Sequence, residues 1–104
     1  MIDNQQSWIG GARLDIFNVT WPFAKLTVSH ERLCLKVTFW GAMSFRPDQV
    51  LKIEPVGIIP FFGKGIQIHH NLDMQVNPST VIFWYIAKDA QKIISDLHQW
   101  GYGE

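Results

Sequence analysis

The chain has 104 residues, a length that predicts one domain spanning 1–104, with a core large enough to fold without metals or disulfides. Its one cysteine, Cys34, excludes an intramolecular disulfide and a cysteine-rich zinc site. Nine Lys and Arg balance nine Asp and Glu in a dispersed pattern without a basic stripe, so we expect no nucleic-acid partner.

The first half predicts short strands. Residues 1–7 are polar, and we expect them to be flexible. A period-two pattern starts at Arg13–Ile16 and is interrupted by Asn18–Pro22. The clearest prediction is an antiparallel hairpin of Lys25–Ser29 and 33–40, joined by a polar turn. Its second strand places one set on the core face (Leu33, Leu35, Val37, Phe39) and the other set outside (Cys34, Lys36, Thr38, Trp40).

The second half continues with strands and ends in a helix. We predict a turn at Arg46–Gln49 and strands at 43–45, 50–56, 66–70 and 81–86. The last strand has no polar face, so either both sides are buried or one side forms an apolar surface for a partner. An apolar stripe at helical spacing predicts an amphipathic helix over Lys88–Trp100 that ends at Gly101.

Three features together resemble the bacterial pleckstrin-homology-like (PH-like, GRAM-related) domains: the run Trp21–Val28, the stretch Phe45–Val50, and the strand-then-helix ending. The resemblance implies a barrel of two nearly orthogonal antiparallel sheets, about seven strands in all, capped by the helix. Members of this group bind phosphoinositides, peptides or other proteins. Lipid-binding members carry a Lys and Arg cluster around the first hairpin. This chain has Arg13 and Lys25 there, separated by Asp15, so we do not expect an inositol-phosphate pocket.

Several residues are candidates for an interaction surface. The apolar run Ile58, Ile59, Pro60, Phe61 and Phe62, followed by Lys64, is either a loop tip that inserts into a membrane or partner groove, or a segment that folds back as core. Trp40 is the best single candidate for an exposed contact, and Trp84 lies on the apolar last strand. We expect most of the five tryptophans to be core.

Catalytic and metal-binding patterns are weak. His69 and His70 are adjacent on a strand and point to opposite faces. The segment Gly63–Gly65 lacks the spacing and the Ser or Thr of a phosphate loop. Ser29 and His30 are adjacent at a strand end, which points their side chains apart, and no nucleophile–base motif is found. We therefore predict no enzyme activity, no cofactor and no metal, and infer no obligatory small molecule.

The leading hypothesis is a non-catalytic module for protein–protein contacts or self-association, and the alternative is a peripheral membrane module that uses residues 58–64. A small-molecule or enzymatic domain with a pocket at the barrel mouth is the third. The sequence shows neither a secretory signal nor the roughly 18 apolar residues that span a bilayer. A cytoplasmic protein is therefore expected.

Overall fold

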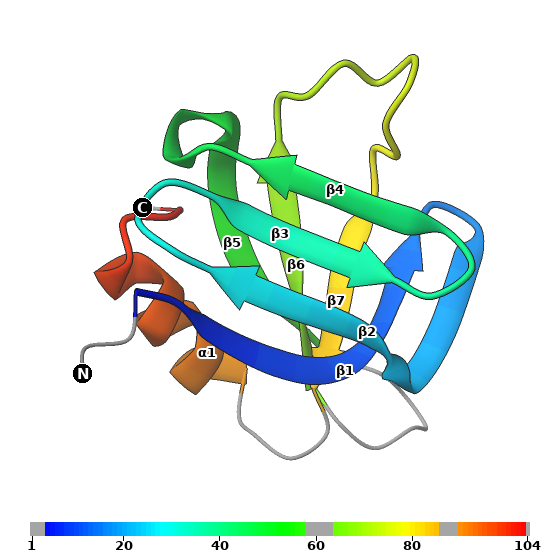
Figure 1. Cartoon of the computed structure of the whole chain (residues 1–104), viewed down its shortest axis with the longest axis horizontal. Coiled ribbons are helices and arrows are strands. Elements are labelled where there is room, and N and C mark those ends of the chain that lie inside the picture. Colours follow the sequence, from blue (N-terminus) through cyan, green and yellow to red (C-terminus); the bar gives the residue numbers. More distant parts are fainter. Residues whose placement is uncertain (1–3, 58–63, 86–89, 104) are drawn as a thin grey trace.

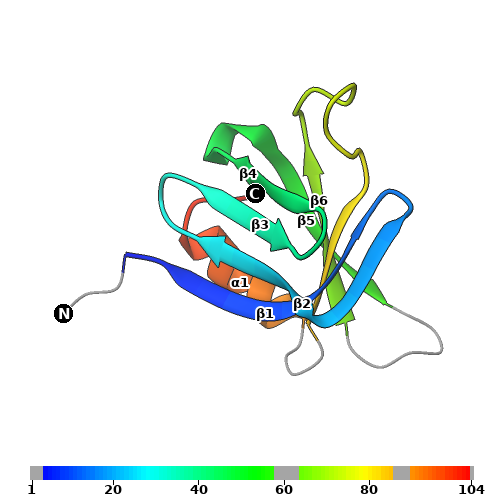
Figure 2. The ribbon, with the colours of Figure 1, turned by 45° about the vertical axis from the view of Figure 1, so that its right-hand side comes forward.

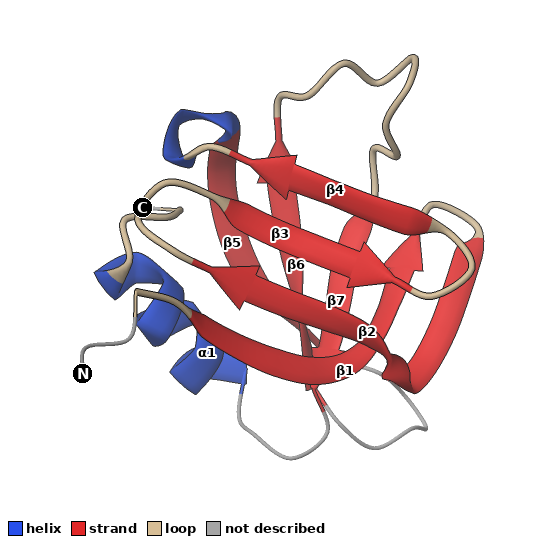
Figure 3. Cartoon of the chain, viewed as in Figure 1, coloured by secondary structure: helices blue, strands red, loops and turns tan. Residues whose placement is uncertain are grey.

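The computed structural model describes residues 4–57, 64–85 and 90–103. Within these residues, seven antiparallel strands form one sheet in the order β4-β3-β2-β1-β7-β6-β5, which curls into a half-barrel (Figure 1). The strands are β1 (Gln6–Leu14), β2 (Phe17–Val28), β3 (Leu33–Val37), β4 (Gly41–Phe45), β5 (Val50–Gly57), β6 (Lys64–His70) and β7 (Val81–Tyr85). A short 3-10 helix, η1 (Pro47–Gln49), and the C-terminal helix α1 (Ala90–Gln99) complete the fold. The predicted fold class, mainly β with one C-terminal α-helix, is confirmed (Figure 3).

Strand β1 joins the two halves of the sheet. It pairs with β2 along most of its length, and its last four residues, Gly11–Leu14, also pair with β7. Strands β2, β3 and β4 therefore lie on one side of β1, and β7, β6 and β5 lie on the other. The two halves run in different directions and enclose the core between them (Figure 2).

Alternation along the strands builds the core. In the predicted hairpin, Val28 pairs with Leu33 and Leu26 with Leu35, and all four side chains are fully buried. This confirms the hairpin prediction, because period-two side chains on neighbouring strands reach the same face. The largest fully buried side chains come from both halves of the sheet, the helix and the C-terminal segment: Tyr102, Phe45, Phe83, Leu26, Leu33, Leu35, Ile66, Ile68, Ile93 and Leu97.

Helix α1 covers one end of the half-barrel, at the left in Figure 1. Ile93, Ile94 and Leu97 are buried, as the helical stripe predicts. The helix ends where Gly101 takes a φ of 102°. The Gly101 amide donates to the His98 carbonyl at 3.0 Å and the Tyr102 amide donates to the Leu97 carbonyl at 3.0 Å. This is the Schellman pattern, which satisfies the last helical carbonyls and turns Tyr102 back into the core.

The start of β1 is tied to this helix. The Gln6 side chain donates to the Asp96 carboxylate (3.2 Å) and accepts from the Trp100 indole (3.0 Å). Lys92 reaches the other oxygen of Asp96 at 2.7 Å. The strand thus begins at Gln6, so the last two residues of the segment that we expected to be flexible belong to β1.

Because of Tyr102, we expect the protein to lose stability at alkaline pH. Its side chain is buried and its hydroxyl donates to the Ser29 carbonyl at 2.8 Å. Burial raises the pKa of Tyr102 from 10.0 to about 12. The raised pKa contributes stability that is fully present below pH 10 and is lost as the pH rises from 10 toward 12, because the unfolded chain releases this proton first.

We expect wild type to lose more unfolding free energy over this interval than Tyr102→Phe, in urea titrations followed by circular dichroism. Both proteins share the lysine titrations, so the difference between them isolates Tyr102. Equal losses in the two proteins would contradict the prediction.

Two local predictions are wrong. Residues Asn18–Pro22 do not interrupt the strand but lie inside β2, which is twelve residues long. The chain turns instead at Asp15–Ile16, between β1 and β2. Asp15 has a φ of 56° there, and its carboxylate accepts a hydrogen bond from the Thr80 amide at 2.9 Å. Phe39 does not share the core face of Leu33, Leu35 and Val37, because β3 ends at Val37 and the chain turns there. Residue propensity and alternation cannot show where a strand ends when a tertiary contact determines that position.

Candidate functional site

A large irregularity in β2 exposes two aromatic side chains. Ala12 pairs with Val19 and Gly10 pairs with Ala24, so the four residues 20–23 face the single residue Gly11. Regular pairing would place one residue there, and the three extra residues bulge outward and bend the strand. Trp21 and Phe23 lie in this bulge and are 57% and 44% exposed. The bulge therefore turns apolar side chains toward solvent.

The β3–β4 turn places two more aromatic side chains beside the bulge. The Trp40 amide donates to the Val37 carbonyl at 3.1 Å, which closes a four-residue turn. Phe39 is the third residue of this turn and has a φ of 71°. A positive φ at that position usually selects Gly or Asn, and it strains a bulky L-residue. Phe39 is nevertheless 90% exposed, so its ring receives little packing in return for the strained backbone.

The bulge and the turn are held together. The Thr38 amide donates to the Phe23 carbonyl at 2.9 Å, and both segments lie at the right-hand end of Figure 1, away from α1. Trp40 is 36% exposed, and it lines the same pocket as Phe23 and Phe39. We call Trp21, Phe23, Phe39 and Trp40 the aromatic end of the molecule.

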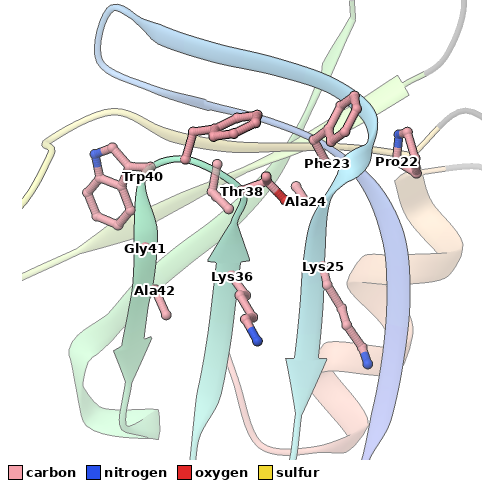
Figure 4. Close-up of a pocket in the computed structure, with 11 residues that line it drawn as sticks. Pro22, Phe23, Ala24, Lys25, Lys36, Thr38, Trp40, Gly41 and Ala42 are labelled. Carbon is pink, nitrogen blue, oxygen red and sulfur yellow. The ribbon is translucent and has the colours of Figure 1, made fainter.

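A pocket of about 580 Å³ opens on the outer face of β2, β3 and β4 (Figure 4). Phe23, Thr38 and Trp40 lie along the end of the strands, and the side chains of Lys25 and Lys36 run side by side away from them. Gly41 and Ala42 line the pocket on β4. Their small size leaves room beside Trp40.

Lys25 and Lys36 form a cross-strand pair in this pocket. They are directly opposite each other in the β2–β3 register, which places their Cβ atoms roughly 4.5–5.5 Å apart. The register continues to Ile9 on one side and Ala42 on the other, so this row carries no carboxylate. Among the described residues, no ion pair involves either lysine. We call these two residues the lysine pair.

Several charged side chains elsewhere on the described surface have ion-pair or hydrogen-bond partners. The Glu54 carboxylate accepts a hydrogen bond from His69 at 2.6 Å, and its other oxygen lies 3.6 Å from the Lys52 ammonium. The hydrogen bond from His69 is the main cause that lowers the pKa of Glu54. The Thr80 amide likewise lowers the pKa of Asp15. The lysine pair differs from these groups because two like-charged residues occupy directly opposite positions on neighbouring strands, and no ion pair is found for either among the described residues.

The structure places the predicted site residues in different regions. Trp40 belongs to the aromatic end. Trp84 lies on the outer face of β7, half-buried over Gly65, where a Cβ would meet its ring at 2.3 Å. Lys64 begins β6, and its backbone pairs with Gly57 and Tyr85. The remaining predicted residues, Ile58, Ile59, Phe61 and Phe62, lie outside the described residues.

Two expectations about apolar residues are also resolved. Strand β7 pairs on both edges, with β1 and β6, and its outer side chains Ile82 and Trp84 are half-buried. Its outer face is thus intermediate between the two alternatives, neither fully buried nor an exposed apolar surface. Of the five tryptophans, Trp8 is buried in the core, Trp84 and Trp100 are half-buried, and Trp21 and Trp40 are exposed, so the expectation that most are core is wrong.

Sequence reasoning missed Trp21, Phe23, Phe39 and the lysine pair as parts of one site. One signal was present for Phe39, because Phe39-Trp40-Gly41 places a glycine directly after two aromatic residues, as at the end of a turn. The lysines carried no such signal. Their opposition depends on the β2–β3 register, which the spacing of single residues does not reveal.

The described residues contain no group of three or more His, Cys, Asp or Glu that could hold a metal ion. Within the same residues, no helix has the length and apolar character needed to cross a membrane. The arrangement at the aromatic end provides apolar contact area next to paired positive charge. Such a surface suits an anionic partner that also offers an apolar phase or side chain.

No protein-family model matches the chain, and no curated protein matches it. A solved structure, the C-terminal domain of an unknown protein from Leishmania infantum, is similar in fold, with a TM-score of 0.66 and 16% sequence identity. The alignment covers 91% of this chain and 81% of the other. At this identity the similarity concerns the fold alone.

Proposed function

We propose that this protein is a non-catalytic module that attaches to anionic membrane surfaces through its aromatic end. The observation that carries the proposal is Phe39, which is 90% exposed at a turn position with a φ of 71°. Strained backbone conformations of this kind cluster at binding sites. A turn optimised for folding alone would carry Gly there.

The shape of the aromatic end favours a bilayer over a protein groove. Its side chains project from two separate segments, the β2 bulge and the β3–β4 turn. The β1–β2 turn, with Ile16 at 95% exposure, lies at the same end (Figure 1). Separate apolar tips suit a fluid apolar phase, where Trp and Phe enter the interface and lysines remain at headgroup level. A PH-like identity, with this surface in place of a basic cluster at the first hairpin, is part of the proposal.

The spacing of the charges agrees with this orientation. Lys25 is two residues from Phe23 and Lys36 is three residues from Phe39. At about 3.3 Å per strand residue, the Lys25 and Phe23 positions on β2 lie roughly 7 Å apart, and Lys36 pairs with Lys25. Apolar groups of interfacial proteins enter to about 5–10 Å, which would place the lysine pair at the level of the lipid phosphates.

Vesicle co-sedimentation tests the proposal. We expect binding to vesicles that contain phosphatidylglycerol, weaker binding as salt rises, and much weaker binding to phosphatidylcholine alone. Trp40→Ser should lower the partition coefficient at least about tenfold, because burial of such a side chain contributes about 1.5–3 kcal/mol. The matched control is Leu51→Ser on β5, which removes a side chain that is 57% exposed outside the aromatic end. Equal losses in both variants, or no binding at low salt, would refute membrane attachment.

A further inference from the structure

The lysine pair has a feature that membrane attachment alone does not require. Lys25 and Lys36 stand directly opposite each other on β2 and β3, and their side chains run in the same direction along the pocket (Figure 4). Neither has an ion-pair partner among residues 4–57, 64–85 and 90–103. Like charges directly opposite on neighbouring strands destabilise a sheet. A general attraction to anionic lipid would be served equally by lysines placed apart, since that attraction depends on their number near the surface.

We infer that the lysine pair recognises a lipid headgroup that ends in a phosphate monoester, an inference that rests on the proposed membrane attachment. A phosphate monoester carries a charge of about −1.5 to −2 at pH 7, whereas a diester carries one negative charge. Two adjacent ammonium groups neutralise such a dianion, and its three terminal oxygens can accept from both. The charge and donor number of the pair therefore match a monoester better than a diester.

The rest of the pocket is compatible with this occupant. The eleven lining residues include no carboxylate that would repel a dianion. Phe23 and Trp40 border the same opening, where the glycerol and upper acyl carbons of a lipid would lie if the phosphate rests between the lysines. The pocket volume of about 580 Å³ is in the range of small-molecule sites.

The test compares two kinds of vesicle with equal surface charge. One contains phosphatidic acid, whose headgroup is a phosphate monoester, and the other contains phosphatidylglycerol, a diester. We expect wild type to bind the phosphatidic acid vesicles about tenfold more tightly. The double variant K25Q/K36Q should bind both vesicles equally, and the control Lys52→Gln, which removes a positive charge on β5, should keep the preference.

The outcomes separate this inference from the proposed function. Equal binding of wild type to both vesicles would overturn the monoester inference and leave membrane attachment standing. Absence of binding to either would overturn both. A soluble phosphoserine peptide that binds wild type as tightly as the phosphatidic acid vesicles would assign the pair to a protein partner and overturn the lipid inference. If K25Q/K36Q still prefers phosphatidic acid vesicles, other groups recognise the headgroup, and the assignment to the lysine pair is overturned.

Discussion

Phe39→Gly is expected to abolish most membrane binding while leaving the protein at least as stable as wild type. In the left-handed region an L-residue costs about 1–2 kcal/mol, and Gly recovers this strain but loses about 0.5–1 kcal/mol through its larger unfolded-state entropy. The Phe39 ring is 90% exposed, so its removal sacrifices little packing. The free energy of unfolding should therefore stay the same or rise by up to about 1.5 kcal/mol.

Binding should change in the opposite direction. Loss of the most exposed ring of the aromatic end should lower vesicle partitioning by tenfold or more, since about 1.5–3 kcal/mol of apolar burial is removed. Phe39→Trp is the matched control, because it keeps a ring at the same strained position. We expect it to bind vesicles as wild type does. Denaturant unfolding and co-sedimentation on the same samples give both readouts, and a loss of more than about 1 kcal/mol in Phe39→Gly would identify the ring as a structural contact.

Gly10→Ala is expected to destabilise the fold severely. Gly10 is buried where β1 crosses β7, and a Cβ there would lie 2.0 Å from the Trp84 carbonyl oxygen and 2.9 Å from the Phe83 ring. The first contact is with backbone, so no side-chain rotation relieves it. We expect a loss of at least about 3 kcal/mol, at the upper end of overpacking effects and large against the usual 5–15 kcal/mol of total stability.

Gly65→Ala provides the comparison. Its Cβ would meet the Trp84 ring at 2.3 Å and the Phe83 carbonyl oxygen at 2.9 Å. Adding Trp84→Ala should therefore recover part of the loss caused by Gly65→Ala and none of the loss caused by Gly10→Ala. Urea unfolding of the single and double variants measures both couplings. Equal recovery in the two backgrounds would mean that β1 and β7 can separate enough to admit the extra methyl group.

Local pattern predicted the regular parts of this fold. The alternation in 25–37 indicated the β2–β3 hairpin, and the stripe Ile93, Ile94 and Leu97 indicated the helix and its buried face. These predictions held because the side-chain periods of strands and helices are properties of the backbone itself. Gly101 correctly marked the helix end, since a left-handed residue there favours glycine.

The candidate site was not predictable in the same way, apart from Trp40. Trp21 and Phe23 are exposed because three extra residues of β2 bulge opposite Gly11, and Phe39 is exposed because β3 stops two residues before it. Both the bulge in β2 and the end of β3 depend on the register in which each strand pairs with its neighbour. A residue's own neighbours in the sequence carry little information about that choice.

The amino-acid sequence by itself determined the class of the fold, the order of its elements, the core face of the β2–β3 hairpin and the buried stripe of α1. These follow from periodicity, turn chemistry and helix capping, which act within a few residues. Tertiary structure alone decided that two lysines eleven positions apart face each other and that the β2 bulge meets the β3–β4 turn. The physical reason is register, because cross-strand pairing brings distant residues together and sets which side chains share a surface.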